Sequence, residues 1–166
     1  MNRIVSLIAS STETICALGY RDSLVGRSHE CDYPPSVLSL PACSEAKFDL
    51  EGASKEIDER VRKTLATEQS VYRTHVDLLQ KLDPTLIVTQ DHCEICAVVL
   101  KDVEQAVRED LEGRPEIVSL APSSLEGIFD GMIEIASALG DAEKGRLMVA
   151  WLKQRMDRAW RIRSKS

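Results

Sequence analysis

One short sequence occurs twice in this chain, at residues 4–15 and again at 117–128, and the two copies are identical at eight of twelve positions. Each copy begins with a run of apolar and β-branched residues, continues through a pair of serines, and ends in apolar residues at helical spacing. A glycine follows each predicted helix, Gly19 after the first and Gly140 after the second, which is typical of a helix C-terminus. The pattern therefore predicts a strand, a tight loop and a helix, built twice.

The two loops predict helix caps and a binding edge. A Ser-x-x-Glu pattern, Ser10 with Glu13 and Ser123 with Glu126, is typical of a capping box at a helix N-terminus. Strand-to-helix units that repeat along a chain predict a parallel sheet, and open parallel sheets bind ligands at the carboxyl ends of their strands. The serine-rich loops belong at that edge, where their backbone N–H groups could hold an anionic or amide group of a ligand.

The chain between the two copies continues the alternation of strand and helix. Apolar, β-branched runs predict strands at 24–28 and 86–89. Apolar residues at spacing three or four predict helices at 54–67, at 76–82 and around 99–111. We therefore predict an α/β fold with a short parallel sheet between layers of helices.

A long helix is predicted at the end of the chain. Apolar residues from Met148 to Trp160 follow one helical face, and the helix is expected to start near Asp141. We predict a single three-layer α/β/α lobe over residues 1–140 and a long C-terminal helix over residues 141–166. A helix of about twenty residues spans ~30 Å, more than a small sheet requires, so part of its apolar face is expected to meet something outside the lobe.

Composition excludes several classes of function. The balance of 27 acidic against 21 basic side chains gives a formal net charge of −6, which disfavours nucleic acid or an anionic membrane surface as a partner. No apolar stretch approaches the ~20 residues of a transmembrane helix, so we expect no membrane-embedded segment. The glycine-rich phosphate loops and nucleophile motifs of common enzymes are missing from the sequence. We therefore predict a binding protein and not an enzyme.

The cysteines and the first residues predict a location. The five cysteines are an odd number in a chain large enough to fold without disulfides, which favours reduced thiols. Only Asn2 and Arg3 stand between the initial methionine and the first apolar run. That run stops at Ser10 and is too short for the apolar core of a signal peptide. Both observations predict a cytoplasmic protein.

Histidines and cysteines follow two of the predicted strands and form a candidate metal site. One loop holds two thiols three residues apart beside an imidazole, a spacing that suits zinc or iron, or a redox pair of thiols. If the two strands are parallel neighbours, both loops end at the same edge. The predicted metal ligands are His29, Cys31, His92, Cys93 and Cys96. The alternative is that the cysteines are small residues packed at a helix start.

The order of these parts resembles the substrate-binding proteins of ABC importers for cobalamin and iron-siderophores, and it is most similar to the cobalamin branch. The resemblance rests on Arg3-Ile4-Val5-Ser6-Leu7, Thr12-Glu13 with Ala17-Leu18-Gly19, Leu24-Val25-Gly26, Asp32-Tyr33-Pro34-Pro35 and Leu82-Asp83-Pro84-Thr85-Leu86-Ile87. In that family two α/β lobes, joined by one long helix, clamp the ligand between them. The resemblance implies that this chain is the N-terminal lobe and that residues 141–163 are the joining helix.

The resemblance also implies a small-ligand site at the strand ends. The ligand-binding residues that we predict there are Ser10, Ser11, Thr12, His29, Glu30, Pro122 and Ser123. Asp77 falls where the family's lobe carries the glutamate that docks on the transporter. The chain departs from the family's pattern in its missing export signal, in the charged segment 54–67, and in Glu30, which stands near the position of an aromatic residue.

These observations together predict a small-ligand binding protein. The predicted ligand is cobalamin or another metal chelate, whose metal His29 or His92 could coordinate axially. A lone lobe would leave half of such a ligand exposed, which predicts a homodimer or a separate second lobe. The alternative function is a zinc- or iron-binding or thiol-redox protein that uses the cluster of histidines and cysteines.

Overall fold

A computed structural model of the chain describes residues 2–68, 70–91, 103–105, 107 and 114–163. The strands are β1 (Ile4–Ser6), β2 (Leu24–Arg27), β3 (Ser44–Ala46), β4 (Tyr72–Thr74), β5 (Leu86–Gln90) and β6 (Glu116–Leu120). The α-helices are α1 (Ala9–Ala17), α2 (Ser54–Thr67), α3 (Val76–Leu82), α5 (Leu125–Ala138) and α6 (Ala142–Arg163), and short 3-10 helices are η1 (Arg21–Ser23) and η2 (Pro35–Ser39).

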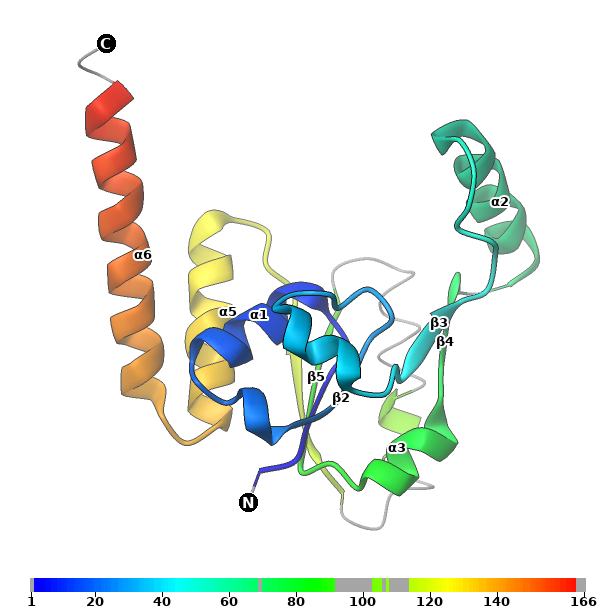
Figure 1. Cartoon of the computed structure of the whole chain (residues 1–166), viewed down its shortest axis with the longest axis horizontal. Helices are drawn as coiled ribbons and strands as arrows, with labels where there is room; N and C mark the ends of the chain where they lie inside the picture. Colours follow the sequence, from blue (N-terminus) through cyan, green and yellow to red (C-terminus); the bar gives the residue numbers. More distant parts are fainter. Residues whose placement is uncertain (1, 69, 92–102, 106, 108–113, 164–166) are drawn as a thin grey trace.

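Four parallel strands form the main sheet, in the order β2-β1-β5-β6 (Figure 1). β1 pairs with β2 on one side and with β5 on the other, and β6 extends the sheet beyond β5. β3 and β4 pair with each other as a separate antiparallel ribbon. Because all four main strands run in the same direction, their carboxyl ends meet at one edge, and the loops that follow β1, β2 and β6 gather there.

Apolar side chains on the two faces of the sheet bury two separate cores. On one face Ile4 and Val88 pack with Ile15 of α1 and Ile135 of α5. On the other face Val5 and Ile87 pack with Leu79 of α3 and with Val103 and Val107. Helices therefore cover both faces of the sheet, whose central strands β1 and β5 are almost entirely buried, as is usual for parallel strands. The predicted three-layer α/β/α lobe is confirmed.

Both copies of the repeated sequence fold as a strand followed by a helix that ends at a glycine. Gly19 has φ +79° and Gly140 has φ +83°, values that L side chains rarely adopt. In each copy the residue after the glycine donates its N–H to a carbonyl five residues back, Tyr20 to Ile15 and Asp141 to Ala136. This is the hydrogen bond of a Schellman motif, and it closes the helix in the same way twice.

The predicted capping boxes were wrong in both copies. α5 is capped by Ser124, whose Oγ accepts from the N–H of Gly127 at 3.0 Å, and not by Ser123. α1 begins already at Ala9, its N-cap is Ile8, and no side chain caps it, so Ser10 lies inside the first turn. The reason is that Thr12 stands where the second copy has Leu125, and its hydroxyl bonds back to Ser6 and Ile8 at the strand end, which fixes the helix start there.

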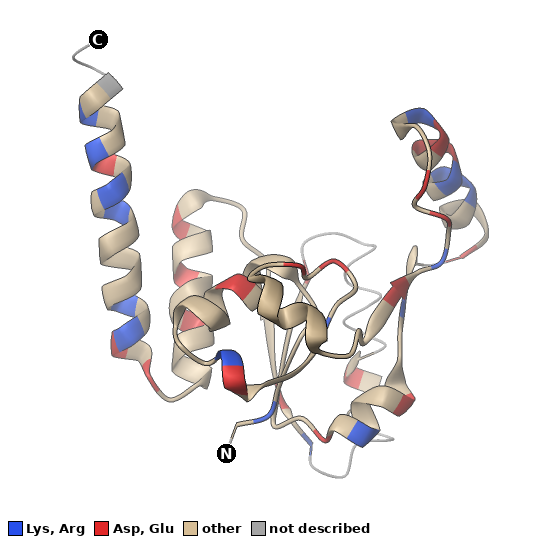
Figure 2. Ribbon diagram, viewed as in Figure 1, with Lys and Arg blue, Asp and Glu red and all other residues tan. Residues whose placement is uncertain are grey.

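The long helix α6 lies beside α5 (Figure 1). Its C-terminal half continues beyond the first turn of α5, on the side of the carboxyl edge of the sheet. Trp151 and Trp160 on this helix are 54% and 69% exposed. Figure 2 shows lysines and arginines along α6, whereas α5 carries acidic side chains and no basic ones. No helix among the described residues combines the length and the apolar character that crossing a membrane requires.

The contact between α5 and α6 depends on Gly145. A Cβ at this position would lie 2.6 Å from the Cβ of Ala136 and 3.1 Å from the Cα of Ile133. We predict that Gly145→Ala lowers the free energy of unfolding by about 1 kcal/mol or more, because overpacking costs more than the gain in helix propensity. Urea denaturation followed by circular dichroism measures the change.

Gly127→Ala is the matched control, since the new Cβ there would meet its nearest atoms at 3.4 Å. We expect this second substitution to be neutral or to stabilise the protein by up to about 1 kcal/mol. Equal stabilisation by both substitutions would show that the two helices do not approach as closely as the structure has them.

Candidate functional site

A buried cluster of small polar side chains lies directly beneath the carboxyl edge. The hydroxyl of Thr12 lies 2.8 Å from the Oγ of Ser6 and 3.0 Å from the Sγ of Cys31. The same sulfur lies 3.5 Å from the Oγ of Ser28, whose hydroxyl also accepts from the N–H of Glu30 at 3.1 Å. These four side chains are buried, and together they join the end of β1, the first turn of α1 and the loop after β2. The loop that carries His29 and Glu30 is therefore held in place from below.

His29 and Glu30 lie at the rim of a small hollow over the ends of β1, β2 and β5. The N–H and the Nδ1 of His29 lie 3.3 and 2.9 Å from the Oγ of Ser44. The hydroxyl of Tyr72 lies 3.2 Å from the Oε1 of Glu30, and the ring of Tyr72 lies 5.3 Å from the imidazole. Thr89 and Gln90 at the end of β5 complete the lining together with Leu7 and Ser28. The ribbon of β3 and β4 thus supplies one wall of the hollow.

The imidazole of His29 is held in its neutral form by its surroundings. Burial lowers the pKa of His29 below its usual value, although the carboxylates of Glu30 and Glu45 act in the opposite direction. The Nε2 atom is buried and has no hydrogen-bond partner among the described residues. A water molecule or a ligand group would satisfy this ring nitrogen.

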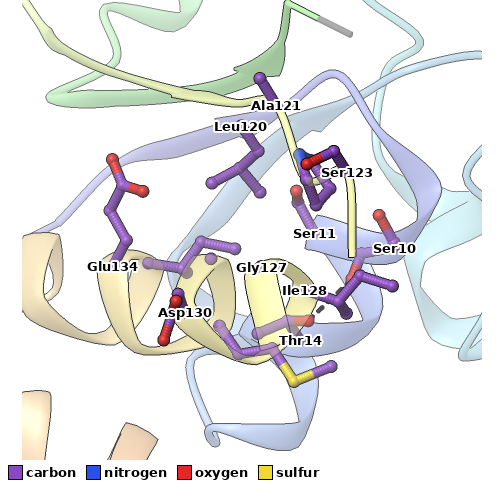
Figure 3. A pocket seen from close by; sticks show the side chains of 14 residues that line it. Ser10, Ser11, Thr14, Leu120, Ala121, Ser123, Gly127, Ile128, Asp130 and Glu134 are labelled. Atoms are coloured by element: carbon purple, nitrogen blue, oxygen red, sulfur yellow. Dashed lines mark hydrogen bonds between the residues drawn. The ribbon is translucent and has the colours of Figure 1, made fainter. Parts of the chain in front are cut away.

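A larger groove, of about 400 Å³, lies between α1 and α5 at the same edge of the sheet (Figure 3). One wall carries Ser10, Ser11 and Thr14 of α1, and the other carries residues 127–135 of α5. The loop 120–123 after β6 forms the end of the groove. Both copies of the repeated sequence therefore line the same groove, although β5 lies between their strands β1 and β6.

The structure brings the predicted ligand-binding residues to one edge but divides them between the two depressions. Ser10, Ser11, Pro122 and Ser123 line the groove, and His29 and Glu30 line the hollow. Thr12 lies below the surface in the hydroxyl cluster.

Sequence reasoning missed Ser44 and Tyr72, which come from the antiparallel ribbon. No periodicity predicted this ribbon, because each of its strands has only three residues.

The predicted metal site is only partly within the described residues. Cys31 is buried among hydroxyl groups, whereas His92, Cys93 and Cys96 lie outside the described part of the chain. Within that part, no three His, Cys, Asp or Glu side chains lie close enough together to hold a metal ion. Burial raises the pKa of the Cys43 thiol to about 11, so this thiol stays protonated at neutral pH. The five-residue metal site remains a prediction.

Comparison with known proteins identifies the fold. No protein-family model and no curated protein sequence matches this chain. Solved structures do match. The periplasmic vitamin B12-binding protein of Vibrio cholerae matches at 21% identity and a TM-score of 0.63, over 94% of this chain and 48% of that chain. A periplasmic heme-binding protein of Pseudomonas aeruginosa matches at 19% identity and a TM-score of 0.64, over 95% of this chain and 45% of that chain.

The periplasmic heme-binding protein of Roseiflexus sp. RS-1 matches in the same way, at 24% identity and a TM-score of 0.63, over 95% of this chain and 48% of that chain. This chain therefore has the fold of the N-terminal lobe of such binding proteins, as the resemblance implied, and spans less than half the length of each of these three. These three structures are those of binding proteins.

The predicted cytoplasmic location was wrong in the light of this comparison, because the structures with this fold belong to periplasmic proteins. The thiols misled the prediction for a physical reason. Cys31 and Cys43 are free but fully buried. A buried thiol is shielded from oxidants, so a free cysteine does not require a reducing compartment.

The hydroxyl cluster generates a prediction about stability. Thr12→Val keeps the shape of the side chain but leaves Ser6 and Cys31 without the hydroxyl between them. We expect a loss of about 1–3 kcal/mol in the free energy of unfolding, the usual cost of an unpaired buried polar group, measured by urea denaturation. Thr14→Val is the control, since Thr14 bonds only to the carbonyl of Ser10 within its own helix. A cost no greater at Thr12 than at Thr14 would refute a structural role for the cluster.

His29 generates a prediction about pH. Because burial lowers the pKa of His29 in the folded state, the unfolded chain takes up the proton first as the pH falls. The stability that depends on neutral His29 is therefore complete above about pH 6.5, the ordinary pKa of histidine, and decreases below it. The measurement is the urea denaturation midpoint between pH 5 and 8, a range that extends about one unit or more on either side of that pKa. The midpoint should depend less on pH in His29→Gln than in the wild type. The idea fails if His75→Gln, at the N-cap of α3, removes the dependence and His29→Gln does not.

Proposed function

We propose that this chain is one lobe of a binding protein for a planar metal chelate such as a cobalamin or a heme. The carboxyl edge of the sheet is the proposed binding surface. The observation that carries the proposal is the placement of His29 there, with a buried Nε2 that has no hydrogen-bond partner among the described residues. The shared fold supports the proposal, because the structures at TM-scores of 0.63 and 0.64 are those of proteins that bind vitamin B12 or heme.

The chemistry of the hollow suits a metal chelate. Imidazole nitrogen and phenolic oxygen are both ligands of chelated iron in proteins, and His29 and Tyr72 lie with their rings 5.3 Å apart. A neutral imidazole is the form that binds a metal, and burial keeps His29 neutral at physiological pH. The Nε2 atom is buried in this arrangement, so axial coordination requires the ring to turn toward the ligand.

A second lobe would cover the other face of the chelate. α6 continues past the edge of the sheet and carries exposed Trp151 and Trp160, apolar surface that a further lobe would bury (Figure 1). A second copy of this chain and a separate second lobe are the two proposed sources of that cover. Asp77 stays the proposed docking position for a transporter: its carboxylate is exposed at the start of α3 and pairs with Lys81 at 3.9 Å.

The proposal predicts direct binding of a chelate. Titration with dicyanocobinamide and with hemin, followed by absorbance, should give saturable binding of at least one of them. One chelate per two chains would indicate a homodimer, and one per chain would show that each lobe binds a chelate without a second copy. His29→Ala should weaken binding about tenfold or more, as expected for the loss of a metal ligand or of its support.

Lys81→Ala is the control for this experiment, because Lys81 lies on α3 just before the start of β5, at the opposite end of the sheet. Its affinity should equal that of the wild type. If neither chelate binds, or if both substitutions change the affinity equally, the carboxyl edge is not a chelate site.

A further inference from the structure

The last turns of α6 project beyond α5, its neighbour in the lobe. The two helices run in opposite directions (Figure 1). The Nζ of Lys153 lies 4.8 Å from the centre of the Phe129 ring, and Phe129 lies about one turn after the start of α5 at Leu125. α6 therefore passes the end of α5 about one turn after Lys153. We call residues 156–162, which lie past that point, the α6 extension.

The face of α6 that packs on α5 continues along the extension. Gly145 lies against Ala136 of α5, and Val149 is buried one turn later. Met156 follows Gly145 by about three helical turns, so it lies on the same face of the helix. Trp160 follows Val149 by the same interval. Both side chains are nevertheless exposed, Met156 at 45% and Trp160 at 69%, because α5 has ended beneath them.

The extension and the turn before it carry a positive charge. Every residue from 153 to 162 is exposed. The basic residues of this stretch are Lys153, Arg155, Arg158 and Arg161 (Figure 2). The only acidic residue in its sequence is Asp157. An apolar ridge with basic flanks fits a surface that is apolar in its centre and acidic at its rim.

The groove between α1 and α5 has this complementary character (Figure 3). The apolar residues that line it are Leu120, Pro122, Ile128, Met132 and Ile135. Asp130 and Glu134 border it, and its described lining includes no lysine, arginine or histidine. Glu126 continues the acidic row on α5 at a spacing of four, and all three carboxylates are exposed. The groove lies at the carboxyl edge, the side toward which the α6 extension projects.

We propose that the α6 extension of a second copy of this chain lies in the α1–α5 groove, and that two copies exchange this contact about a twofold axis. Each chain carries both halves of the contact, and a twofold axis brings both halves of each copy into use. The chain does not make the contact with itself, because α6 is one continuous helix whose extension runs past its own α5. Each α6 then spans two lobes, its first half on its own α5 and its extension on the partner.

This contact names the second copy as the source of cover for the chelate. The carboxyl edges of the two copies face each other in such a dimer, and the hollow that His29 borders opens between them. The inference rests on the function proposed above for the role of the dimer. The contact itself requires no chelate, so the two proposals can be tested separately.

Sedimentation velocity of the whole chain at increasing protein concentration tests the contact. We expect a monomer–dimer equilibrium without added chelate. Raising the salt concentration from ~0.05 M to ~0.5 M should raise the dissociation constant about threefold or more, because the charges on both surfaces are exposed and are screened. A monomer at every concentration up to about 1 mM, the dissociation constant of a very weak complex, would overturn the proposal.

Charge reversal identifies the two surfaces. One variant carries Arg158→Glu with Arg161→Glu on the extension, and the other carries Asp130→Lys with Glu134→Lys in the groove. All four positions are exposed, so the fold should be retained. Each variant alone brings like charges together, which should raise its dissociation constant about tenfold or more. An equimolar mixture pairs opposite charges at both contacts and should form the dimer that neither variant forms alone.

The matched control for charge is Lys81→Glu with Arg114→Glu. Both residues are exposed and lie near the amino ends of β5 and β6, and the change in net charge equals that of the reversed extension. The dissociation constant of this control should stay within about twofold of the wild-type value, because exposed charges far from the contact are screened.

Trp160→Ala tests the apolar half of the contact. Truncating a large aromatic residue at the centre of an interface should raise the dissociation constant about tenfold or more. Leu147→Ala is the matched control, since Leu147 is similarly exposed, at 62%, but lies on the opposite face of α6 from Met156. This control should dimerise like the wild type.

The outcomes separate the contact from the chelate function. Wild-type-like dimers of the reversed variants, or a mixture that associates no better than its components, would overturn the proposed contact and leave chelate binding standing. A protein that dimerises and responds to charge reversal as expected, but binds neither dicyanocobinamide nor hemin, would overturn the proposed function and leave the contact standing.

Discussion

The parallel pairing of β1 with a strand on each side is the constraint on which the rest of the structure depends. Ile4, Val5 and Ser6 are completely buried, and their register with β2 and β5 fixes where three strands end. From that edge the chain leaves β1, β2 and β6 through short connections. The hollow and the groove both lie there, each lined by residues that directly follow a strand.

The hydroxyl cluster beneath the edge explains how small loops hold a precise geometry. Thr12 joins the sheet to α1, and Cys31 joins both to the loop after β2, at sulfur–oxygen distances of 3.0 and 3.5 Å. Satisfied buried polar groups rigidify their surroundings, because each lost bond leaves a partner unpaired in a low-dielectric interior. Among the described residues, five buried side-chain atoms have no hydrogen-bond partner: Oγ of Ser11, Nε of Arg27, Nε2 of His29, Oγ1 of Thr74 and Oγ of Ser119. Of these residues, Ser11 and His29 line depressions in the surface.

Much of the fold could be predicted from the sequence, because its signals are local. The helix of residues 54–67 and the helix of 76–82 have the predicted ends, and the repeated strands and glycines lie where the pattern places them. The cap of α1 was mispredicted because Thr12 bonds to the strand end, a tertiary interaction. The cap of α5 lies one residue after the predicted one. Tyr72 and Ser44 were missed because only the folded ribbon brings them to His29, and the division of the predicted ligand residues between two depressions is likewise a result of packing.

Hydrogen–deuterium exchange in the presence of a saturating chelate, dicyanocobinamide or hemin, tests the central claim most directly. The account predicts slower exchange in peptides that cover residues 7–12, 28–31 and 120–124, which surround the carboxyl edge. Peptides that cover residues 83–86, at the amino end of β5, should exchange at the same rate with and without the chelate. Protection confined to the amino end, or bound chelate without any protection at the carboxyl edge, would contradict the account.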